Sequence, residues 1–256
     1  MKSKDTSWSN VAGWYDEMLE QSPDSYQAKV ILPNIIRLAD PKPGMTILDL
    51  ACGQGYFSRA FAEKGAQVIG CDISKELIER AKKHSPAGIQ YHVAPANKLS
   101  FMADHSADAV TIILALQNIE DIAGTLVECS RILKPEGKLF IVINHPAFRI
   151  PGNSSWQWDE KGNKQYRRID AYMSDAQNKI DMTPGEPVAA KKTFTTSFHR
   201  PLQSYFKAIG KAGFAVTRLE EWISHKKSQK GPRGDEEDRI RKEIPMFVCV
   251  EGKRVS

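Results

Sequence analysis

The stretch "ILDLACGQGYFSRAFAEKGAQVIGCDIS", residues 47–74, decides the fold. It contains an apolar run, a turn with two glycines, a helical pattern closed by a further glycine, and a second apolar run. This is the order of a βαβ unit whose first turn holds a nucleotide. Two residues depart from a dinucleotide-binding fingerprint. Ser58 stands where its third glycine belongs, and Asp49 adds a carboxylate at the end of the first run. The stretch therefore predicts a nucleotide-like ligand that tolerates an extra acid.

The same alternation of apolar runs and helical patterns continues along the chain. We expect strands at 45–50, 66–71, 89–94, 107–116, 137–144, 214–222 and 245–252, and helices at 25–39, 55–65, 74–85, 123–135 and 200–213. Such alternation predicts parallel strands joined by right-handed crossovers. The last two runs lie close together without a full crossover between them, so we expect these strands to pair antiparallel at one edge of the sheet.

Composition and charge restrict the class of protein. The chain has 256 residues, of which 41% are hydrophobic and 26% charged, with a net charge of +5. These values are typical of a globular protein, and the cations are too dispersed to predict a nucleic-acid-binding surface. The four cysteines form no CxxC pair, and neither a signal peptide nor a membrane-spanning run is recognisable. We therefore expect a cytoplasmic protein with reduced cysteines and without nucleic-acid or membrane partners.

The acids of the opening stretch distinguish between nucleotide ligands. Asp72 follows Gly53 by nineteen residues, where an acid binds ribose hydroxyls in nucleotide-binding folds. Gly53 and Gly55 would bring bare backbone against the ligand. Asp49 would face the place of a pyrophosphate, and like charges a few ångströms apart cost energy on the order of kcal/mol. A ligand with a ribose, a carboxylate and a cationic centre avoids that repulsion, and S-adenosylmethionine has all three.

Several motifs resemble those of class I S-adenosylmethionine-dependent methyltransferases, most closely over residues 11–145. "LDLACGQG" (48–55) and "VIGCDIS" (68–74) resemble the first two motifs of the family, which usually has glycine where Ala51 stands. "VAPANKLSF" (93–101), "LALQNIED" (114–121) and "RILKPEGKLFIVI" (131–143) resemble the segments after the third and fourth strands and the turn into the fifth. In the segment at 93–101 the family usually has an acid beside the adenine, whereas this chain has Pro95 and Ala96.

The resemblance implies which residues hold the cofactor. Asp49, Ala51, Cys52, Gly53, Gln54 and Gly55 would surround the methionine end, Asp72 and Ile73 the ribose, Pro95, Ala96 and Asn97 the adenine, and Leu114 and Ala115 the underside of the cofactor. Tyr15 and Tyr26 would cover the cofactor from an amino-terminal helical region. The cofactor would be S-adenosyl-L-methionine, with S-adenosyl-L-homocysteine as product, and we expect no metal site.

The implied fold is α/β: a Rossmann-like, doubly wound, seven-stranded sheet, mostly parallel with an antiparallel last strand, and with helices on both faces. Residues 1–44 would form the helical cover, and 45–146 with 201–256 the methyltransferase domain. Residues 147–200 show little periodicity and are expected to form an insertion that serves as a substrate lid.

The expected activity is methyl transfer to a small-molecule acceptor, at oxygen or carbon. His145, directly after the fifth expected strand, and His199, where the insertion returns to a helix, are the candidate bases. The insertion contains Phe148, Trp156, Trp158, Tyr166, Tyr172, Phe194 and Phe198, which suit an apolar acceptor. Arg167, Arg168, Lys191 and Lys192 would instead favour an acidic one.

Other functions remain open at this point. A non-catalytic S-adenosylmethionine-binding protein would carry the same motifs. An NAD-dependent oxidoreductase is disfavoured by Asp49 and Ser58, and an RNA or protein methyltransferase by the lack of a recognition domain or a dense basic stripe. The sequence predicts neither the acceptor nor the oligomeric state.

Overall fold

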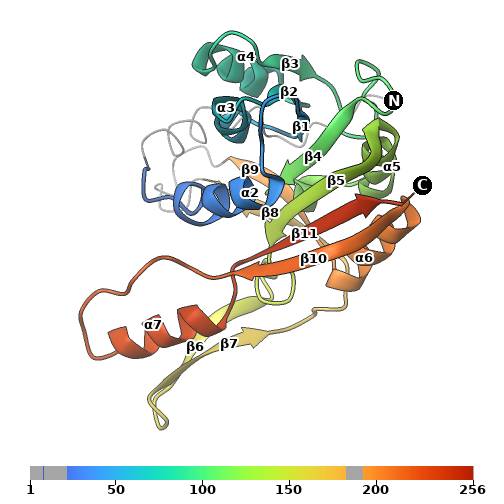
Figure 1. Cartoon of the computed structure of the whole chain (residues 1–256). Coiled ribbons are helices and arrows are strands. Elements are labelled where there is room, and N and C mark those ends of the chain that lie inside the picture. Colours follow the sequence, from blue (N-terminus) through green and yellow to red (C-terminus); the bar gives the residue numbers. More distant parts are fainter. Residues whose placement is uncertain (1–7, 9–21, 183–192, 256) are drawn as a thin grey trace.

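A computed structural model describes residue 8 and residues 22–182 and 193–255 of the chain. Its centre is a seven-stranded sheet in the order β10-β11-β5-β4-β1-β2-β3 (Figure 1). The strands are β1 (Thr46–Leu50), β2 (Gln67–Asp72), β3 (Gln90–Val93), β4 (Ala107–Ile113), β5 (Leu133–Asn144), β10 (Phe214–Trp222) and β11 (Phe247–Arg254). The strand order reverses between β1 and β4, so a ligand crevice is expected at the carboxyl ends of these strands.

The last strand runs against its neighbours. β11 pairs antiparallel with β5 on one side and with β10 on the other, whereas β1, β2, β3, β4 and β5 are mutually parallel. The predicted fold class is thereby confirmed, including the antiparallel last strand. This strand is internal to the sheet, and β10 forms the edge.

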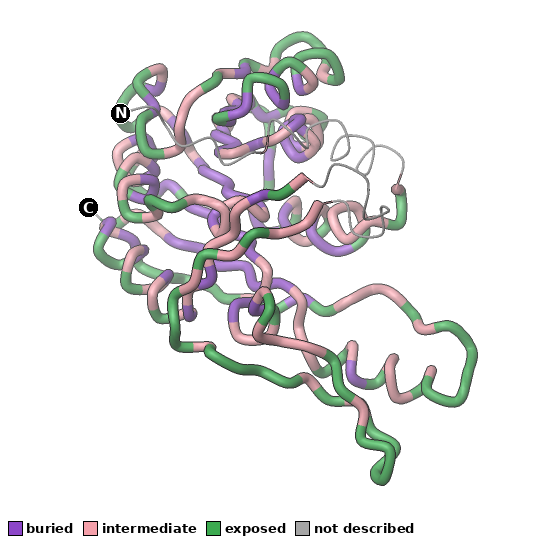
Figure 2. The backbone as a smooth tube through the Cα atoms, turned by 180° about the vertical axis from the view of Figure 1, so that it is seen from behind, coloured by how far each residue is buried: buried purple, intermediate pink, exposed green. Residues whose placement is uncertain are grey.

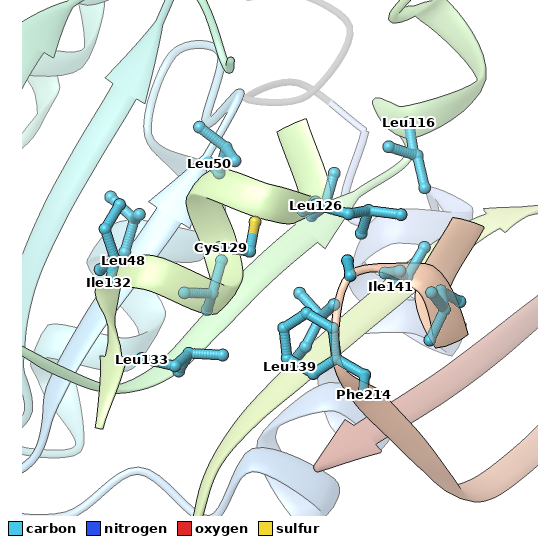
Figure 3. Close-up of a cluster of buried hydrophobic side chains, with 14 of the residues drawn as sticks. Leu48, Leu50, Leu116, Leu126, Cys129, Ile132, Leu133, Leu139, Ile141 and Phe214 are labelled. Atoms are coloured by element: carbon cyan, nitrogen blue, oxygen red, sulfur yellow. The ribbon is translucent and has the colours of Figure 1, made fainter. Parts of the chain in front are cut away.

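Helices cover both faces of the sheet. They are α2 (Leu32–Ala39), α3 (Tyr56–Glu63), α4 (Lys75–His84), α5 (Ile122–Ile132) and α6 (Leu202–Lys211), with a π-helical turn η2 (Gln27–Ile31) and a 3₁₀ turn η3 (Leu116–Asn118). A further helix, α7 (Gly234–Glu243), packs against residues 164–169 of the insertion and not on the sheet. Helices α2 and α3 pack in one hydrophobic core, and α5 and α6 pack in another. The α5 core contains Leu126, Cys129 and Ile132 (Figure 3).

Strand β5 illustrates why both faces are apolar. Successive side chains of a strand point to opposite faces. Leu139 and Ile141 belong to the core beneath α5 and α6, whereas Phe140 and Val142 belong to the core beneath α2 and α3. All four are at most 2% exposed. The nearly continuous apolar run in the sequence is therefore the consequence of burial on two faces.

Local sequence signals set the helix starts around the crevice. The Ser74 hydroxyl accepts a hydrogen bond from the backbone N–H of Leu77 and caps α4. The Asp121 carboxylate accepts from the N–H of Gly124 in the same way and caps α5. Both caps immediately follow the carboxyl-edge loops, so the helices hold these loops in place.

The insertion at 147–200 forms two hairpins rather than irregular chain. They pair β6 (Ser154–Asp159) with β7 (Lys164–Ile169), and β8 (Ala176–Asp181) with β9 (Phe194–His199). The first hairpin and α7 extend from the body of the molecule (Figure 1), and their backbone is mostly exposed or half-buried (Figure 2). Because neither face of β6–β7 is fully buried, its sequence lacks the alternation that indicates a strand.

Candidate functional site

The turn between β1 and α3 is held in left-handed backbone conformations. The φ angles are 57° at Ala51, 57° at Gly53 and 82° at Gly55. The N–H of Cys52 donates to the carbonyl of Cys71 at 2.9 Å, which ties the turn to β2. Left-handed φ favours glycine, so the family preference for glycine in place of Ala51 has a conformational reason.

Gly55 is constrained by a neighbour as well as by its φ angle. A Cβ atom built at this position would lie 2.4 Å from the Tyr91 hydroxyl oxygen and 3.2 Å from the Ala81 Cβ. Tyr91, on β3, is hydrogen-bonded to Ser85 at 2.8 Å and is buried. Gly55 therefore permits close packing behind the turn and does not line the pocket.

Asp72 at the end of β2 organises the same turn. Its Oδ2 accepts a hydrogen bond from the N–H of Gly53 and its Oδ1 one from the N–H of Ser74, both at 2.9 Å. The side chain is 7% exposed. Burial raises the pKa of Asp72, and the N–H donors of Ser74 and Gly53 act in the opposite direction. The carboxylate thus links the glycine turn to the start of α4.

Asp49 lies at the end of β1, next to Asp72, and is 2% exposed. Its Oδ2 accepts from the Ser58 hydroxyl at 2.6 Å and its Oδ1 from the Thr111 hydroxyl at 3.1 Å. Burial raises its pKa to about 6, whereas these two hydroxyl donors lower it and the negative charge of Asp72 raises it further. A cation placed beside Asp49 would relieve the cost of this buried charge.

These elements line a pocket of about 460 Å³ at the carboxyl edge of the sheet. Most residues predicted to bind the cofactor line it: Asp49, Ala51, Cys52, Gly53, Asp72, Ile73, Pro95, Ala96, Asn97, Leu114 and Ala115. The structure therefore brings together side chains from the ends of β1, β2, β3 and β4, as the topology requires.

Three predicted cofactor residues are described but lie outside the pocket lining. Gln54 is 1% exposed and its Oε1 accepts from Arg59 at 2.8 Å. Gly55 packs behind the turn, as described above. Tyr26 packs edge-on against His225 and Phe247 and shares a hydrogen bond of 3.2 Å with Ser224. The expected cover by Tyr26 is thus replaced by packing against the chain that follows β10. Tyr15 lies outside the described residues.

The two histidines predicted as bases also lie outside the lining. His145 is 2% exposed, and its Nε2 is 2.7 Å from Glu221 Oε1. Burial lowers the pKa of His145, an effect that Glu221 opposes. His199 is 5% exposed, and its Nε2 lies 2.9 Å from the carbonyl oxygen of Tyr172. Each buried ring thus makes its hydrogen-bond contact with a residue that also lies outside the pocket lining.

The loop after β4 supplies residues that the sequence analysis did not select. Leu114 has a φ of 55°, and its carbonyl accepts from the side-chain amides of Gln117 (2.8 Å) and Asn118 (3.3 Å). This loop contributes Asn118, Ile119, Glu120 and Asp121 to the lining. Asp121 also accepts a hydrogen bond of 2.7 Å from Asn97, at the corner where Pro95 and Ala96 provide no acid. The sequence signal that could have identified Asp121 is its position directly before helix α5, where an aspartate is a typical N-cap.

One hairpin of the insertion reaches the pocket. Gln177 of β8 and Thr196 and Phe198 of β9 line it, and the Ser197 hydroxyl donates to the Gln117 carbonyl at 3.4 Å. The other aromatic residues named in the sequence analysis are placed elsewhere: Phe148 against His145, Trp156 and Trp158 under arginines, Tyr172 beside His199, and Tyr166 and Phe194 exposed. Trp8, Tyr56 and Phe57 complete the aromatic lining.

The cations proposed to favour an acidic acceptor do not line this pocket within the described chain. Arg167 donates to the Phe148 carbonyl and to Ser154, and Arg168 forms an ion pair with Asp170. Lys191 and Lys192 lie outside the described residues. In the parts of the chain that the structure covers, no cluster of three or more metal-ligating side chains occurs, and none of the helices has the length and apolarity to span a membrane.

Comparisons with known proteins agree with this geometry. Residues 48–141 match the family model described as "Methyltransferase domain". The chain is 34% identical over 131 residues to a ubiquinone biosynthesis O-methyltransferase of Xanthomonas axonopodis, covering 50% of this chain and 54% of that protein. It is 36% identical over 123 residues to a demethylmenaquinone methyltransferase of Streptomyces avermitilis, covering 48% and 52%. The chain therefore spans about half the length of these curated relatives.

Solved structures extend the similarity to nearly the whole chain. An S-adenosylmethionine-dependent methyltransferase of Mesorhizobium loti superposes with a TM-score of 0.71 at 26% identity, covering 90% of this chain and 98% of that one. The similarity thus includes the helices and strands on both sides of the segment that matches the family model.

Proposed function

We propose that this chain, whose residues 48–141 match the methyltransferase-domain family model, is a class I S-adenosylmethionine-dependent methyltransferase that transfers a methyl group from S-adenosylmethionine to a small-molecule acceptor. The proposal rests on the observation that two buried carboxylates, Asp49 and Asp72, line the same pocket beside one glycine turn at the carboxyl edge of the sheet. Two acids at this point suit a ligand with a ribose and a cationic centre and disfavour a pyrophosphate.

The residues of the pocket fit the parts of this cofactor. We assign Asp72 to the ribose hydroxyls, and the turn at Gly53 would bring backbone against the ligand. Asp49 is the acid for the cationic end. Asn97 and Asp121 stand at the corner proposed for the adenine. When bound, the cofactor supplies a methyl group already activated by its sulfonium, so the chain mainly aligns the acceptor and excludes water.

The acceptor end lies between the loop after β4 and hairpin β8–β9. Its lining side chains are Asn118, Glu120, Gln177, Thr196 and Phe198. Within the described lining, lysine, arginine and histidine are absent, which supports an uncharged acceptor with an apolar face against Phe198 and polar groups toward the amides. The name of one relative, a ubiquinone biosynthesis O-methyltransferase, supports oxygen as the methylated atom, while the name of the other, a demethylmenaquinone methyltransferase, gives no atom and leaves carbon as the alternative.

Where the acceptor loses a proton, Glu120 is the group that we propose to receive it. It lines the acceptor end, whereas Asp49, Asp72 and Asp121 are engaged in hydrogen bonds within the protein. A positioned carboxylate contributes about 10²–10⁴-fold to the rate of such a step. Glu120→Gln should lower kcat with little change in S-adenosylhomocysteine affinity, while an unaltered kcat and pH profile would exclude Glu120 as the base.

Two experiments separate this function from its rivals. Calorimetric titration with S-adenosylhomocysteine and with NAD distinguishes a methyltransferase from an oxidoreductase, because binding of NAD alone would refute the proposal. Transfer of a labelled methyl group to metabolites of a cell extract then tests for chemistry. Intact S-adenosylmethionine binding without any transfer would favour a non-catalytic binding protein.

A further inference from the structure

Two buried hydroxyl groups beside Asp49 have no assigned role. Ser58 lies on α3 and Thr111 on β4, and both are 0% exposed. Their hydroxyls donate to Asp49, one to each carboxylate oxygen, at 2.6 Å and 3.1 Å. Ser58 is also the residue that replaces the third glycine of a dinucleotide-binding fingerprint. In such a fingerprint that glycine allows the helix to pack closely on the strand.

Resting on the proposed function, we propose that Ser58 and Thr111 are positioning residues that keep Asp49 an oriented anion, directed at the cationic part of the cofactor. A carboxylate receiving two hydroxyl hydrogen bonds is favoured in its charged form and cannot rotate without breaking them. This role accounts for a serine at the position where a dinucleotide-binding fingerprint has its third glycine.

The other groups around Asp49 do not supply this support. Asp72 faces it from β2 and disfavours its negative charge. The thiols of Cys52 in the turn and Cys71 on β2 are kept neutral, since burial raises the pKa of Cys71 to about 12 and that of Cys52 well above its usual range. Burial also raises the pKa of Tyr91 on β3. From α3 and β4, the described donors are the hydroxyls of Ser58 and Thr111 and the backbone N–H of Ser58, and Ser58→Ala keeps that N–H.

The proposal predicts a specific dependence on pH. Burial sets the pKa of Asp49 in the unliganded protein at about 6. A cationic ligand lowers that pKa, so binding below about pH 6 must release a proton and becomes weaker as the pH falls. Removing a hydroxyl donor raises the pKa further, and the weakening then begins at a higher pH. A neutral ligand in the same pocket gains nothing from the charge and shows neither effect.

The test compares two probes on the full chain by calorimetry from about pH 5 to about pH 7.5, a range in which the α-amino group of the probe stays largely protonated. S-adenosylmethionine carries an ammonium and a sulfonium there, whereas 5′-methylthioadenosine has the same adenosine but neither cation. For Ser58→Ala and Thr111→Val we expect S-adenosylmethionine to bind about 5- to 20-fold more weakly near pH 6 and to recover toward about pH 7.5. Binding of 5′-methylthioadenosine should stay within about twofold. Thr111→Ser keeps the hydroxyl and should behave like the unmodified chain.

Four outcomes would contradict the proposed role of Ser58 and Thr111 or the proposed function. Equal weakening of both probes would show that Ser58 and Thr111 only support the shape of the pocket, and an unchanged pH dependence would overturn the inference. If a variant does not fold, the free energy of unfolding of the unliganded protein is measured from about pH 4 to about pH 6 in the unmodified chain and in Asp49→Asn. Because the pKa of Asp49 is raised in the folded chain, stability should fall as the pH rises over this range, and the fall should be smaller in Asp49→Asn. Absence of that difference would also overturn it. Failure of the unmodified chain to bind either probe at any pH would instead refute the proposed function.

Discussion

The two ends of the pocket, which we propose to hold the cofactor and the acceptor, are built in different ways. At the cofactor end, two strand termini and one turn place Asp49, Gly53 and Asp72 together, and their hydrogen bonds run through buried backbone and buried hydroxyls. At the acceptor end, half-buried or exposed side chains meet from the loop after β4 and from hairpin β8–β9, among them Glu120 and Phe198, which are 78 positions apart in the sequence (198 − 120). The first end depends on local geometry, and the second on packing between distant segments.

Because of this difference, substitutions at the two ends should have different consequences. A substitution at the cofactor end disturbs a turn in which backbone conformation, close packing and charge are all constrained at once. A substitution at the acceptor end changes a surface that can adjust, as loops on a rigid scaffold generally can. We therefore expect large, general effects at the first end and selective effects on acceptor binding at the second.

The largest effect should follow Gly55→Ala, because it adds both a left-handed alanine and a clash with the Tyr91 hydroxyl. We expect a loss of about 2–4 kcal/mol in the free energy of unfolding, measured by denaturant titration. Gly44→Ala is the matched control. Gly44 has a similar φ of 88° with nothing within 4 Å of the added Cβ, so this variant should lose only about 1 kcal/mol. Equal losses in the two variants would contradict the close approach of Tyr91.

Asp72→Ala should weaken S-adenosylhomocysteine binding by about 1–3 kcal/mol, because hydrogen bonds to a charged group and the anchor of the Gly53 turn are lost together. Calorimetric titration measures this change. Asp108→Ala provides the comparison: its carboxylate also accepts from a backbone N–H, that of Thr46, but lies at the opposite edge of the sheet. It should lower stability and leave the affinity unaltered. Full affinity in folded Asp72→Ala would remove Asp72 from the site.

The sequence predicts the end that depends on local geometry better than the end that depends on packing between distant segments. The sheet, its helices and the acids of the first two strands follow from periodicity and from a contiguous motif, so the prediction of the fold was confirmed and Asp49 and Asp72 lie in one pocket. Whether a residue that follows a strand lines the pocket depends on contacts with distant parts of the chain. His145 contacts Glu221, which is 76 positions away, and no local sequence pattern predicts that contact.

His145→Ala tests whether this histidine belongs to either end. We expect the free energy of unfolding to fall by about 1–2 kcal/mol, while kcat and its pH profile remain as in the unmodified chain. Since burial lowers the pKa of His145, its neutral form stabilises the fold above about pH 6.5 and this contribution is lost as the pH falls. The difference in stability should therefore shrink at acid pH. A changed pH profile of turnover would restore His145 as a base.

Phe198→Ala should affect the acceptor selectively. Removing the ring from β9 takes away an apolar wall of the acceptor end, so we expect the acceptor KM to rise about tenfold, with S-adenosylhomocysteine affinity within about twofold. Trp156→Ala, in the other hairpin of the insertion, removes an aromatic side chain that is 41% exposed and outside the lining, and should change neither value. Parallel effects of the two substitutions would contradict a distinct role for β8–β9.

The smallest effect is expected from Ala51→Gly, and the sign of the change in the free energy of unfolding is informative. Alanine at a φ of 57° carries a strain of about 1 kcal/mol that glycine would remove. Glycine also gives the unfolded chain more freedom, which costs about 0.4–1 kcal/mol of stability. The two terms nearly cancel, so thermal or denaturant unfolding should change by less than about 1 kcal/mol. Because the turn keeps its backbone path, S-adenosylhomocysteine affinity should be retained. A loss well beyond that range would mean that the methyl group of Ala51 makes contacts which outweigh its strain, and the cofactor end would then depend on side-chain packing as much as on backbone geometry.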